Sequence, residues 1–384
     1  MPNSSFTGSS YDSMIREIVI IKLSALGDVL RTTALLKPLR QKYPDARITW
    51  IAAHEALPLL HGNPFIQRII PCEQAAEAQR SGLSCDLLIS MDEDPTACDL
   101  ASGLRPSRLV GAYRGPDQRL TYTPASAPWF GMGCLNRDPD GGLQHANHLK
   151  RENRKTYVQL WMEILELDHA SYPVGCEPIL VLSPEEREWA AKFLTRSGLG
   201  ADTPIIGLNP GAGSRWSAKQ LPPESAARFI RLLKERIGAP ILLFGGADEA
   251  QRNRRILELA QGDAVDAGTA HPLRAFAALL GCCRVLVTTD SLALHIGTAL
   301  RRYIVALFGP TSPTEIELYG RGFHVMPKCS CRCFYERRCR FIVSCLDELD
   351  YEWCADRIDE ILRGADQLLI ASSLPVGLSD RIAA

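Results

Sequence analysis

Asp28 is the first residue of the chain whose type and position suit catalysis. It closes the turn KLSALGD at residues 22–28, which follows an apolar run, and its carboxylate could accept a proton from an attacking hydroxyl. Ser24 and Asp28 could instead cap the helix that begins here, and a carboxylate at a helix N-terminus is a weak base. The turn lacks the G-x-G-x-x-G pattern of a dinucleotide site and the G-x-x-x-x-G-K pattern of a P-loop, so it favours neither of those sites.

The loop at residues 209–222 carries groups that suit an anionic ligand. Its small residues would let a ligand approach the backbone closely, and Ser214, Arg215 and Lys219 supply hydrogen-bond donors suited to a diphosphate. An ordinary solvated turn is the alternative interpretation.

The loop at residues 244–249 combines glycines with carboxylates. Gly245 and Gly246 come before Glu249, whose carboxylate could hold the hydroxyls of a ribose. A plain glycine turn followed by a helix cap explains the same residues equally well.

A third loop, at residues 288–295, follows a strand and opens a helix. Asp290 leaves the strand, and Ser291 and His295 are four residues apart, so they fall on one face of the helix. Asp290 as a helix cap and His295 as a structural residue are the alternatives. Because these loops follow strands of one sheet, we expect them to line one rim of that sheet.

Short β-branched runs alternate with helical patterns and predict the elements that position these loops. Strands are expected at residues 17–23, 47–53, 66–71 and 86–91, and again at 204–209, 240–244, 284–289 and 303–308. Continuous apolar strands between helices indicate parallel sheets covered on both faces. We therefore predict an α/β protein with two Rossmann-like, doubly wound parallel-sheet domains that face a central cleft.

Length and composition agree with a multidomain globular protein. The chain has 384 residues, of which 46% are hydrophobic and 23% charged, with a formal net charge of -1 that offers no general attraction for nucleic acid. We predict a flexible leader at 1–14, a first domain at 15–180, a second at 181–345, and a helix and tail at 346–384. Residues 112–148, which contain many Gly, Pro, Asn and Arg residues, are expected to be rich in loops.

The N-terminal residues and the cysteines indicate a reducing compartment. No basic region precedes an apolar segment near the start, and no stretch approaches 18 apolar residues, so we expect a cytoplasmic protein. Thirteen cysteines, an odd number, argue against a complete disulfide framework. Peripheral contact with a membrane stays open.

Five cysteines cluster within 17 residues and are interleaved with arginines: Cys329, Cys331, Cys333, Cys339 and Cys345. Their spacing fits neither a zinc ribbon nor a ferredoxin, so a metal site, reversible disulfides and no special chemistry all stay open. The arginines could bind the phosphates of an acidic glycolipid or form a solvated basic turn.

Five motifs occur in a fixed order: KLSALGD at 22–28, NPGAGSRWSAKQLP at 209–222, LLFGG at 242–246, TDSLALH at 289–295 and LFGPTSP at 307–313. Together, over roughly residues 15 to 362, they resemble glycosyltransferase family 9, the ADP-heptose:lipopolysaccharide heptosyltransferases. The resemblance implies a GT-B fold with an N-terminal acceptor lobe, a C-terminal nucleotide-sugar lobe and a last helix that returns to the first lobe.

The resemblance also implies roles for individual residues. Asp28 would be the general base of an inverting transfer, and Lys219 would contact the donor phosphates. Asp290, Ser291 and His295 would lie near the donor diphosphate and sugar. Such enzymes usually need no catalytic metal or other cofactor, because basic groups and helix N-termini stabilise the departing diphosphate.

The chain departs from the family pattern at one position on the acceptor side and at one position on the donor side. Ser24, Gly27 and Arg31 are expected to contact the acceptor, but the family often has His where this chain has Arg31. Leu292 likewise replaces a common Gly beside the donor, so the identity of the sugar stays open. Residues 92–94 spell D-x-D but lie in the expected acceptor lobe, which is the wrong place for a donor metal.

We therefore expect an inverting glycosyltransferase that moves a heptose from ADP-heptose to a lipopolysaccharide core acceptor at the cytoplasmic face of the inner membrane. A catalytically silent GT-B-like protein that binds a nucleotide sugar or glycolipid is the first alternative, prompted by Leu292 and Arg31. A redox or metal-sensing protein built on the cysteine cluster is the second.

Overall fold

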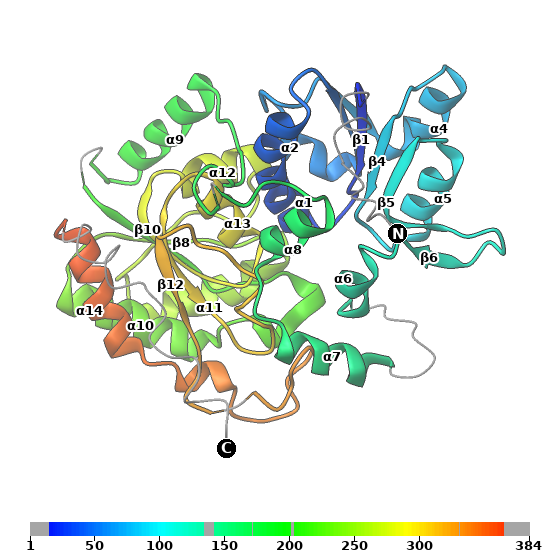
Figure 1. Ribbon diagram of the computed structural model, residues 1–384. Coiled ribbons are helices and arrows are strands. Elements are labelled where there is room, and N and C mark those ends of the chain that lie inside the picture. The colour runs from blue at the N-terminus through cyan, green and yellow to red at the C-terminus, as the bar shows by residue number, and fades with distance from the viewer. Residues whose placement is uncertain (1–14, 134–141, 171, 201–202, 330, 365–384) are drawn as a thin grey trace. The chain divides into compact units, whose positions relative to one another are not determined.

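The computed structural model describes residues 15–133, 142–170, 172–200, 203–329 and 331–364 (Figure 1). The leader expected at 1–14 lies outside the described residues. The chain forms two compact units. The first comprises Met1–Val181 with Thr314–Glu317, and the second comprises Leu182–Pro313 with Leu318–Ala384.

The first unit contains a six-stranded sheet of order β3-β2-β1-β4-β5-β6. The first five strands are parallel and β6 pairs antiparallel with β5. The strands are β1 (Glu17–Ile21), β2 (Arg47–Ala52), β3 (Arg68–Pro71), β4 (Leu87–Ser90), β5 (Arg108–Arg114) and β6 (Leu120–Tyr122). The helices are α1 (Leu26–Thr32), α2 (Leu36–Lys42), α3 (Leu57–Leu60), α4 (Cys72–Arg80), α5 (Pro95–Gly103), α6 (Ala127–Gly131), α7 (Gly142–Glu152) and α8 (Tyr157–Ile164).

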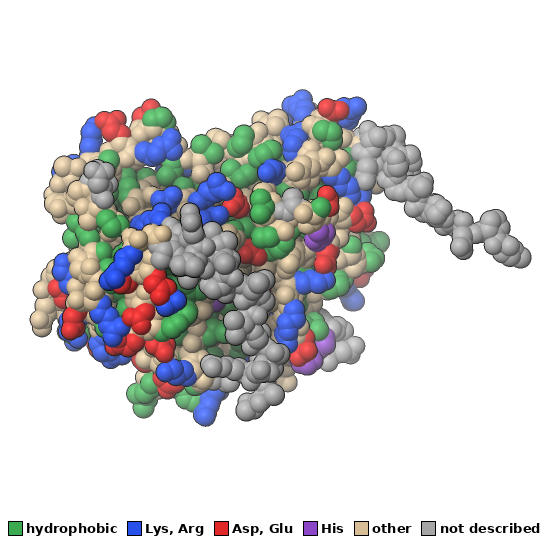
Figure 2. All heavy atoms as spheres, turned by 60° about the vertical axis from the view of Figure 1, so that its left-hand side comes forward, with side chains coloured by type: hydrophobic (Ala, Val, Ile, Leu, Met, Phe, Trp, Pro, Cys, Tyr) green, Lys and Arg blue, Asp and Glu red, His purple; other side chains and the backbone are tan. Residues whose placement is uncertain are grey.

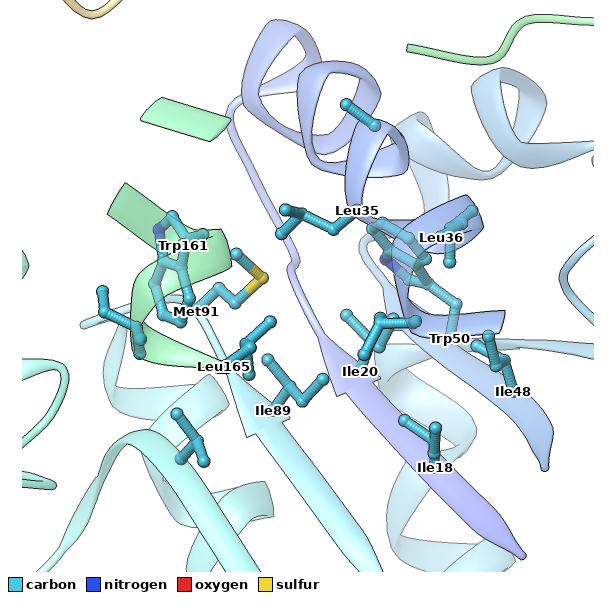
Figure 3. Packing of buried hydrophobic residues seen from close by; sticks show 14 of the residues in the cluster. Ile18, Ile20, Leu35, Leu36, Ile48, Trp50, Ile89, Met91, Trp161 and Leu165 are labelled. Atoms are coloured by element: carbon cyan, nitrogen blue, oxygen red, sulfur yellow. The ribbon is translucent and has the colours of Figure 1, made fainter. Parts of the chain in front are cut away.

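Both faces of the first sheet are buried, as its continuous apolar strands predict. Ile18 and Ile20 of β1 pack into one core, whereas Val19 and Ile21 pack into the other. The first core also holds the fully buried Trp50 and residues of α8 (Figure 3). Because successive side chains of a strand point to opposite faces, a run of β-branched residues such as EIVII requires cover on both sides.

The second unit contains a parallel sheet of order β12-β11-β10-β7-β8-β9. Its strands are β7 (Ile205–Asn209), β8 (Ile241–Leu243), β9 (Val265–Asp266), β10 (Cys283–Thr289), β11 (Tyr303–Leu307) and β12 (Gly322–Val325). Its helices are α9 (Pro184–Arg196), α10 (Pro223–Arg236), α11 (Ala250–Ala260), α12 (Leu273–Leu280), α13 (Leu292–Ala299) and α14 (Tyr351–Leu362). None of the helices in the described ranges combines the length and apolarity needed to cross a bilayer.

The two sheets share one topology. Counted within its own unit, each has the strand order 3-2-1-4-5-6, which is that of the Rossmann fold. The predicted α/β class with two doubly wound sheets is therefore confirmed. Charged side chains of both signs are interspersed on the face shown in Figure 2, in keeping with the near-zero net charge.

The loop-rich stretch at 112–148 contains β6, α6 and much of α7 among its described residues, 112–133 and 142–148. One expectation from the sequence is wrong. The helix expected to return to the first domain, α14, instead packs against α10 and β10 of the second unit. Its apolar residues Cys354, Ile358 and Ile361 are buried in the core of that unit, which accounts for its position. The rest of the predicted tail, residues 365–384, lies outside the described residues.

Candidate active-site loops

In each unit, polar residues meet at the point where the strand order reverses. In the first unit this point lies between β1 and β4, and in the second it lies between β7 and β10. Loops that leave neighbouring strands in opposite directions open a crevice there, where open α/β sheets bind their ligands. The two candidate sites therefore occupy equivalent positions in the two sheets.

Asp28 lies in the first turn of α1, one loop after β1. The N-cap of this helix is Ala25 and no side chain caps it, so the interpretation of Ser24 or Asp28 as the N-cap is wrong. The Asp28 Oδ1 atom is 3.0 Å from Nε of Arg31, and the carboxylate is 37% exposed. Gly27 is buried in the helix and Ser24 is exposed. Asp28 is thus a partly exposed carboxylate that is oriented by an arginine.

Arg31 is itself held by an aromatic ring. Its guanidinium lies 3.9 Å from the centre of the Tyr157 ring, and the Tyr157 hydroxyl is 2.6 Å from Oγ1 of Thr32. Burial raises the pKa of Tyr157, so the phenol stays protonated at neutral pH. Helix α8 begins with a capping box of Thr156 and Gln159, which fixes the start of the helix that carries Tyr157.

A buried ion pair fastens the loop that carries Asp28 to the end of β4. The Lys22 ammonium contacts both the Asp92 carboxylate and the carbonyl oxygen of Ser24. The other Asp92 oxygen accepts hydrogen bonds from the backbone N–H groups of Leu23, at 2.5 Å, and Ser24, at 3.3 Å. The Lys22 and Asp92 side chains are only 6% and 12% exposed. Asp92 therefore fixes the course of the chain four and five residues before Asp28.

The D-x-D sequence at 92–94 does not form a paired carboxylate site. Asp94 accepts a hydrogen bond from the backbone N–H of Thr96 at 2.8 Å and so caps α5. Glu93 accepts a hydrogen bond from the Tyr122 hydroxyl. Asp92, Glu93 and Asp94 thus have three different partners. In the ranges that the structure describes, no group of three or more His, Cys, Asp or Glu side chains could hold a metal ion.

Lys219 and Asp290 form the centre of the candidate site in the second unit. The Lys219 Nζ atom lies 2.7 Å from Oδ2 of Asp290, and Oγ1 of Thr311 donates a hydrogen bond to the same oxygen at 2.8 Å. Burial by itself would raise the pKa of Asp290, but Lys219, with His295 and Thr311, lowers that pKa to about 2. Asp290 does not cap α13, whose N-cap is Ser291.

The end of β7 is tied to the start of α13 by side-chain hydrogen bonds. The Asn209 Nδ2 atom lies 3.1 Å from Oγ of Ser291 and 3.2 Å from the carbonyl oxygen of Gly211. Thr289 donates to the same Gly211 carbonyl at 2.5 Å. His295 is buried in α13, at 8% exposure. These bonds join the loop that follows β7 to the loop that follows β10, and both loops belong to the predicted donor site.

Glu249 connects the two glycine-containing loops. Its carboxylate accepts hydrogen bonds from the backbone N–H groups of Gly213, at 3.0 Å, and Gly246, at 2.9 Å, and lies 3.3 Å from Arg252. The side chain is 7% exposed. Three donors of the protein already hold this buried carboxylate, which favours the helix-cap interpretation over contact with a ribose. Gly245 is buried beside Asn253, which donates to the carbonyl of Phe244.

Ser214 and Arg215 are exposed in the short 3-10 segment Ser214–Lys219, which also carries Lys219. Trp216 contributes a ring whose centre is 5.1 Å from the Lys219 ammonium. The structure therefore brings Ser214, Arg215 and Lys219 into one loop, as the sequence predicts.

The cysteine cluster contains two close pairs. The sulfur atoms of Cys333 and Cys339 are 3.8 Å apart, and a hydrogen bond with Cys331, followed by burial, raises the pKa of the Cys345 thiol. Cys329 is exposed. The described cysteines, twelve in number, are all free thiols.

Sequence reasoning assigned no role in these sites to Lys22, Asn209 or Thr311, and it considered Asp92 only as part of the D-x-D sequence. A signal was present for two of them. Lys22 interrupts an apolar run, and a buried lysine requires an acidic partner. Asp92 follows the neighbouring strand, where such a partner would be found.

The two doubly wound sheets give the chain a GT-B-like α/β fold, and the family match makes it a glycosyltransferase. The chain belongs to glycosyltransferase family 9 (heptosyltransferase), whose family model matches residues 126–339. The family predicted from the five motifs is thereby confirmed.

Individual proteins resemble this chain over most of its length. It is 28% identical over 310 residues to lipooligosaccharide heptosyltransferase 2 of Haemophilus influenzae, covering 77% of this chain and 84% of that protein. Its structure is similar to that of a glycosyltransferase family 9 protein from Veillonella parvula, with a TM-score of 0.68, 21% identity, and coverage of 93% and 98% of the two chains. It also resembles the E. coli ADP-heptose lipopolysaccharide heptosyltransferase II, with a TM-score of 0.61, 19% identity, and coverage of 91% and 99%.

Proposed function

We propose that this chain transfers a heptose from ADP-heptose to a lipopolysaccharide core acceptor, with inversion at the transferred carbon. The observation that carries the proposal is the placement of Asp28 and of the Lys219–Asp290 pair at the switch points of two Rossmann-like sheets. Membership of family 9 and the names of its relatives from H. influenzae and E. coli support the choice of sugar, donor and acceptor.

In the first unit, Asp28 would accept the proton of the acceptor hydroxyl as its oxygen attacks the anomeric carbon. A carboxylate that is paired with Arg31 is a weak base, so the proton would move late, after the bond to the diphosphate has begun to break. The Arg31 guanidinium keeps the carboxylate in one orientation, and Tyr157 keeps the guanidinium in place.

In the second unit, Lys219 would stabilise the negative charge of the departing diphosphate. Its ammonium has three donors, so it can keep its bond to Asp290 and still donate to a phosphate oxygen. Ser291 and the backbone N–H groups at the start of α13 would add further donors and the positive end of a helix dipole. Together these groups would stabilise the negative charge that develops on the diphosphate as it leaves.

The proposal is tested by donor binding followed by turnover. The purified protein would be titrated with ADP-, GDP- and UDP-sugars by calorimetry and then incubated with ADP-heptose and a heptose-deficient core lipopolysaccharide, with mass spectrometry of the product. We expect preference for the ADP-sugar and addition of one heptose. Binding without transfer to any core acceptor would indicate the silent binding protein instead.

Because the proposed acceptor is a glycolipid, we place the enzyme in the cytoplasm at the inner face of the inner membrane. Fractionation of cells that express the protein at its natural level tests this location.

A further inference from the structure

Residues 331–343, here called the basic loop, end in an exposed apolar tip. The tip consists of Phe341, Ile342 and Val343, which are 45%, 105% and 61% exposed. Single apolar residues are common on protein surfaces, but three consecutive large ones with this exposure indicate a surface that contacts something apolar.

Exposed arginines precede the tip in the basic loop, and one of them, Arg340, is paired with Glu336 at 2.8 Å. The basic loop contains four of them, Arg332, Arg337, Arg338 and Arg340, and one acidic residue, Glu336. The row of residues from 337 to 343 is exposed throughout except for Cys339. The Arg332 guanidinium lies 5.5 Å from the centre of the Phe341 ring, so positive charge and apolar surface are adjacent.

The base of the basic loop is fixed to the candidate donor site. The carbonyl oxygen of Arg337 accepts hydrogen bonds from the backbone N–H of Ala218, at 3.0 Å, and from Oγ of Ser217, at 3.3 Å. The Tyr335 backbone N–H donates to the carbonyl of Pro310 at 2.6 Å. The loop is therefore anchored beside Lys219, which follows Ala218, while the side chains of its tip are exposed.

We propose that the basic loop docks the enzyme on an anionic lipid bilayer, with the apolar tip inserted among the headgroups and the arginines on the lipid phosphates. Positive charge next to exposed apolar side chains is the combination that binds such interfaces, and charge complementarity selects anionic lipid. A protein partner would also cover an apolar tip, but it would not require four arginines in the same loop. The inference deepens the proposed function, since it names the surface that would bring the donor site to a glycolipid acceptor.

Vesicle sedimentation tests the inference. The full chain would be mixed with vesicles of phosphatidylglycerol and phosphatidylethanolamine, or of phosphatidylcholine alone. We expect binding to the anionic vesicles only, weakened by salt. The double variant Ile342→Ser/Val343→Ser should lose most of this binding, and Arg337→Ser/Arg338→Ser should weaken it roughly 25-fold, at about fivefold per arginine. The matched control Arg119→Ser/Val174→Ser removes an exposed arginine and an exposed valine elsewhere and should bind like the wild type.

Transfer to a water-soluble, lipid-free core oligosaccharide separates this inference from the proposed function. The variant Ile342→Ser/Val343→Ser should keep wild-type turnover on that acceptor, which also shows that it is folded. Turnover without any binding of the wild type to anionic vesicles would overturn the docking inference and leave the function standing. Vesicle binding without turnover would overturn the function and support docking. Self-association through the tip, seen as a wild-type dimer that the tip variant lacks, together with no vesicle binding, would also overturn docking.

Discussion

The Lys219 ammonium lies 2.7 Å from the Asp290 carboxylate, with both side chains about 15% exposed. The two residues are 71 positions apart in the sequence and come from loops that follow neighbouring strands, β7 and β10. Because each charge compensates the other, both side chains can stay largely buried. The Lys219 ammonium is thereby held in a fixed position, where it could contact a diphosphate.

Replacement of Lys219 by Ala should lower the affinity for ADP at least tenfold. It should also lower the free energy of unfolding by about 3 kcal/mol, because it leaves the Asp290 carboxylate buried without its cation. Calorimetry with ADP and urea unfolding measure the two effects. The double variant Lys219→Ala/Asp290→Asn should regain much of the stability but not the affinity. Unchanged affinity for ADP in Lys219→Ala would contradict the phosphate role.

Asp290 should make the free energy of unfolding depend on pH in the acid range. Its pKa is about 2 in the folded protein and roughly 4 in an unfolded chain. A lowered pKa contributes stability that is present above pH 4 and is lost as the pH falls from 4 toward 2. The stability advantage of the wild type over Asp290→Asn should therefore shrink by about 2 kcal/mol between pH 6 and pH 2. Urea unfolding at several pH values measures this, and parallel pH curves for the two proteins would contradict it.

Residue 211 should have to be glycine, because a side chain there would collide with the carboxylate of Glu249. A Cβ atom at Gly211 would lie 2.0 Å from Glu249 Oε1, so Gly211→Ala must displace the carboxylate from Gly213, Gly246 and Arg252. We expect a loss of about 3 kcal/mol in unfolding free energy. In the matched variant Gly246→Ala the new Cβ would be 4.0 Å from Glu249, and the change should stay within about 1 kcal/mol. Equal losses in the two variants would show that Glu249 does not link the loops.

Asp92 should act as a positioning residue for Asp28. Asp92→Asn puts an amide N–H group beside the Lys22 ammonium or the backbone donors of the loop, so the Asp28 loop should shift. We expect kcat to fall by about 100-fold with the affinity for ADP unchanged, because a shift of about 1 Å costs this much in a transfer reaction. Asp94→Asn is the matched control, since asparagine caps α5 as well as aspartate does. A parallel loss of ADP affinity in Asp92→Asn would argue against a role confined to the first unit.

The sequence predicted four strands of each sheet but missed β5, β6, β9 and β12. Central strands such as β1 are continuous apolar runs, whereas β9 has two residues and β12 (GFHV) is short and only partly buried. The strand β5 contains Gly111 and is flanked by arginines, so its pattern is that of a loop. Edge strands need less apolar sequence, because fewer of their residues are buried.

The site was predictable where one loop supplies it and not where two loops meet. Ser214, Arg215 and Lys219 lie within six consecutive residues, so the sequence alone indicated that they belong to one site. The bond of Lys22 to Asp92, 70 residues later, depends on the order of strands in the sheet. The position of α14 was missed for a similar reason, since its apolar face does not say which of the two units it covers.

The proposed role of Asp28 as the base of a heptosyl transfer can be tested by comparing two proteins. Wild-type protein and Asp28→Asn would be assayed with ADP-heptose and a heptose-deficient core acceptor, with ADP affinity measured on the same preparations. We predict transfer by the wild type, and in Asp28→Asn a loss of roughly 100- to 10,000-fold in turnover with ADP affinity unchanged. Undiminished transfer by Asp28→Asn would contradict the claim.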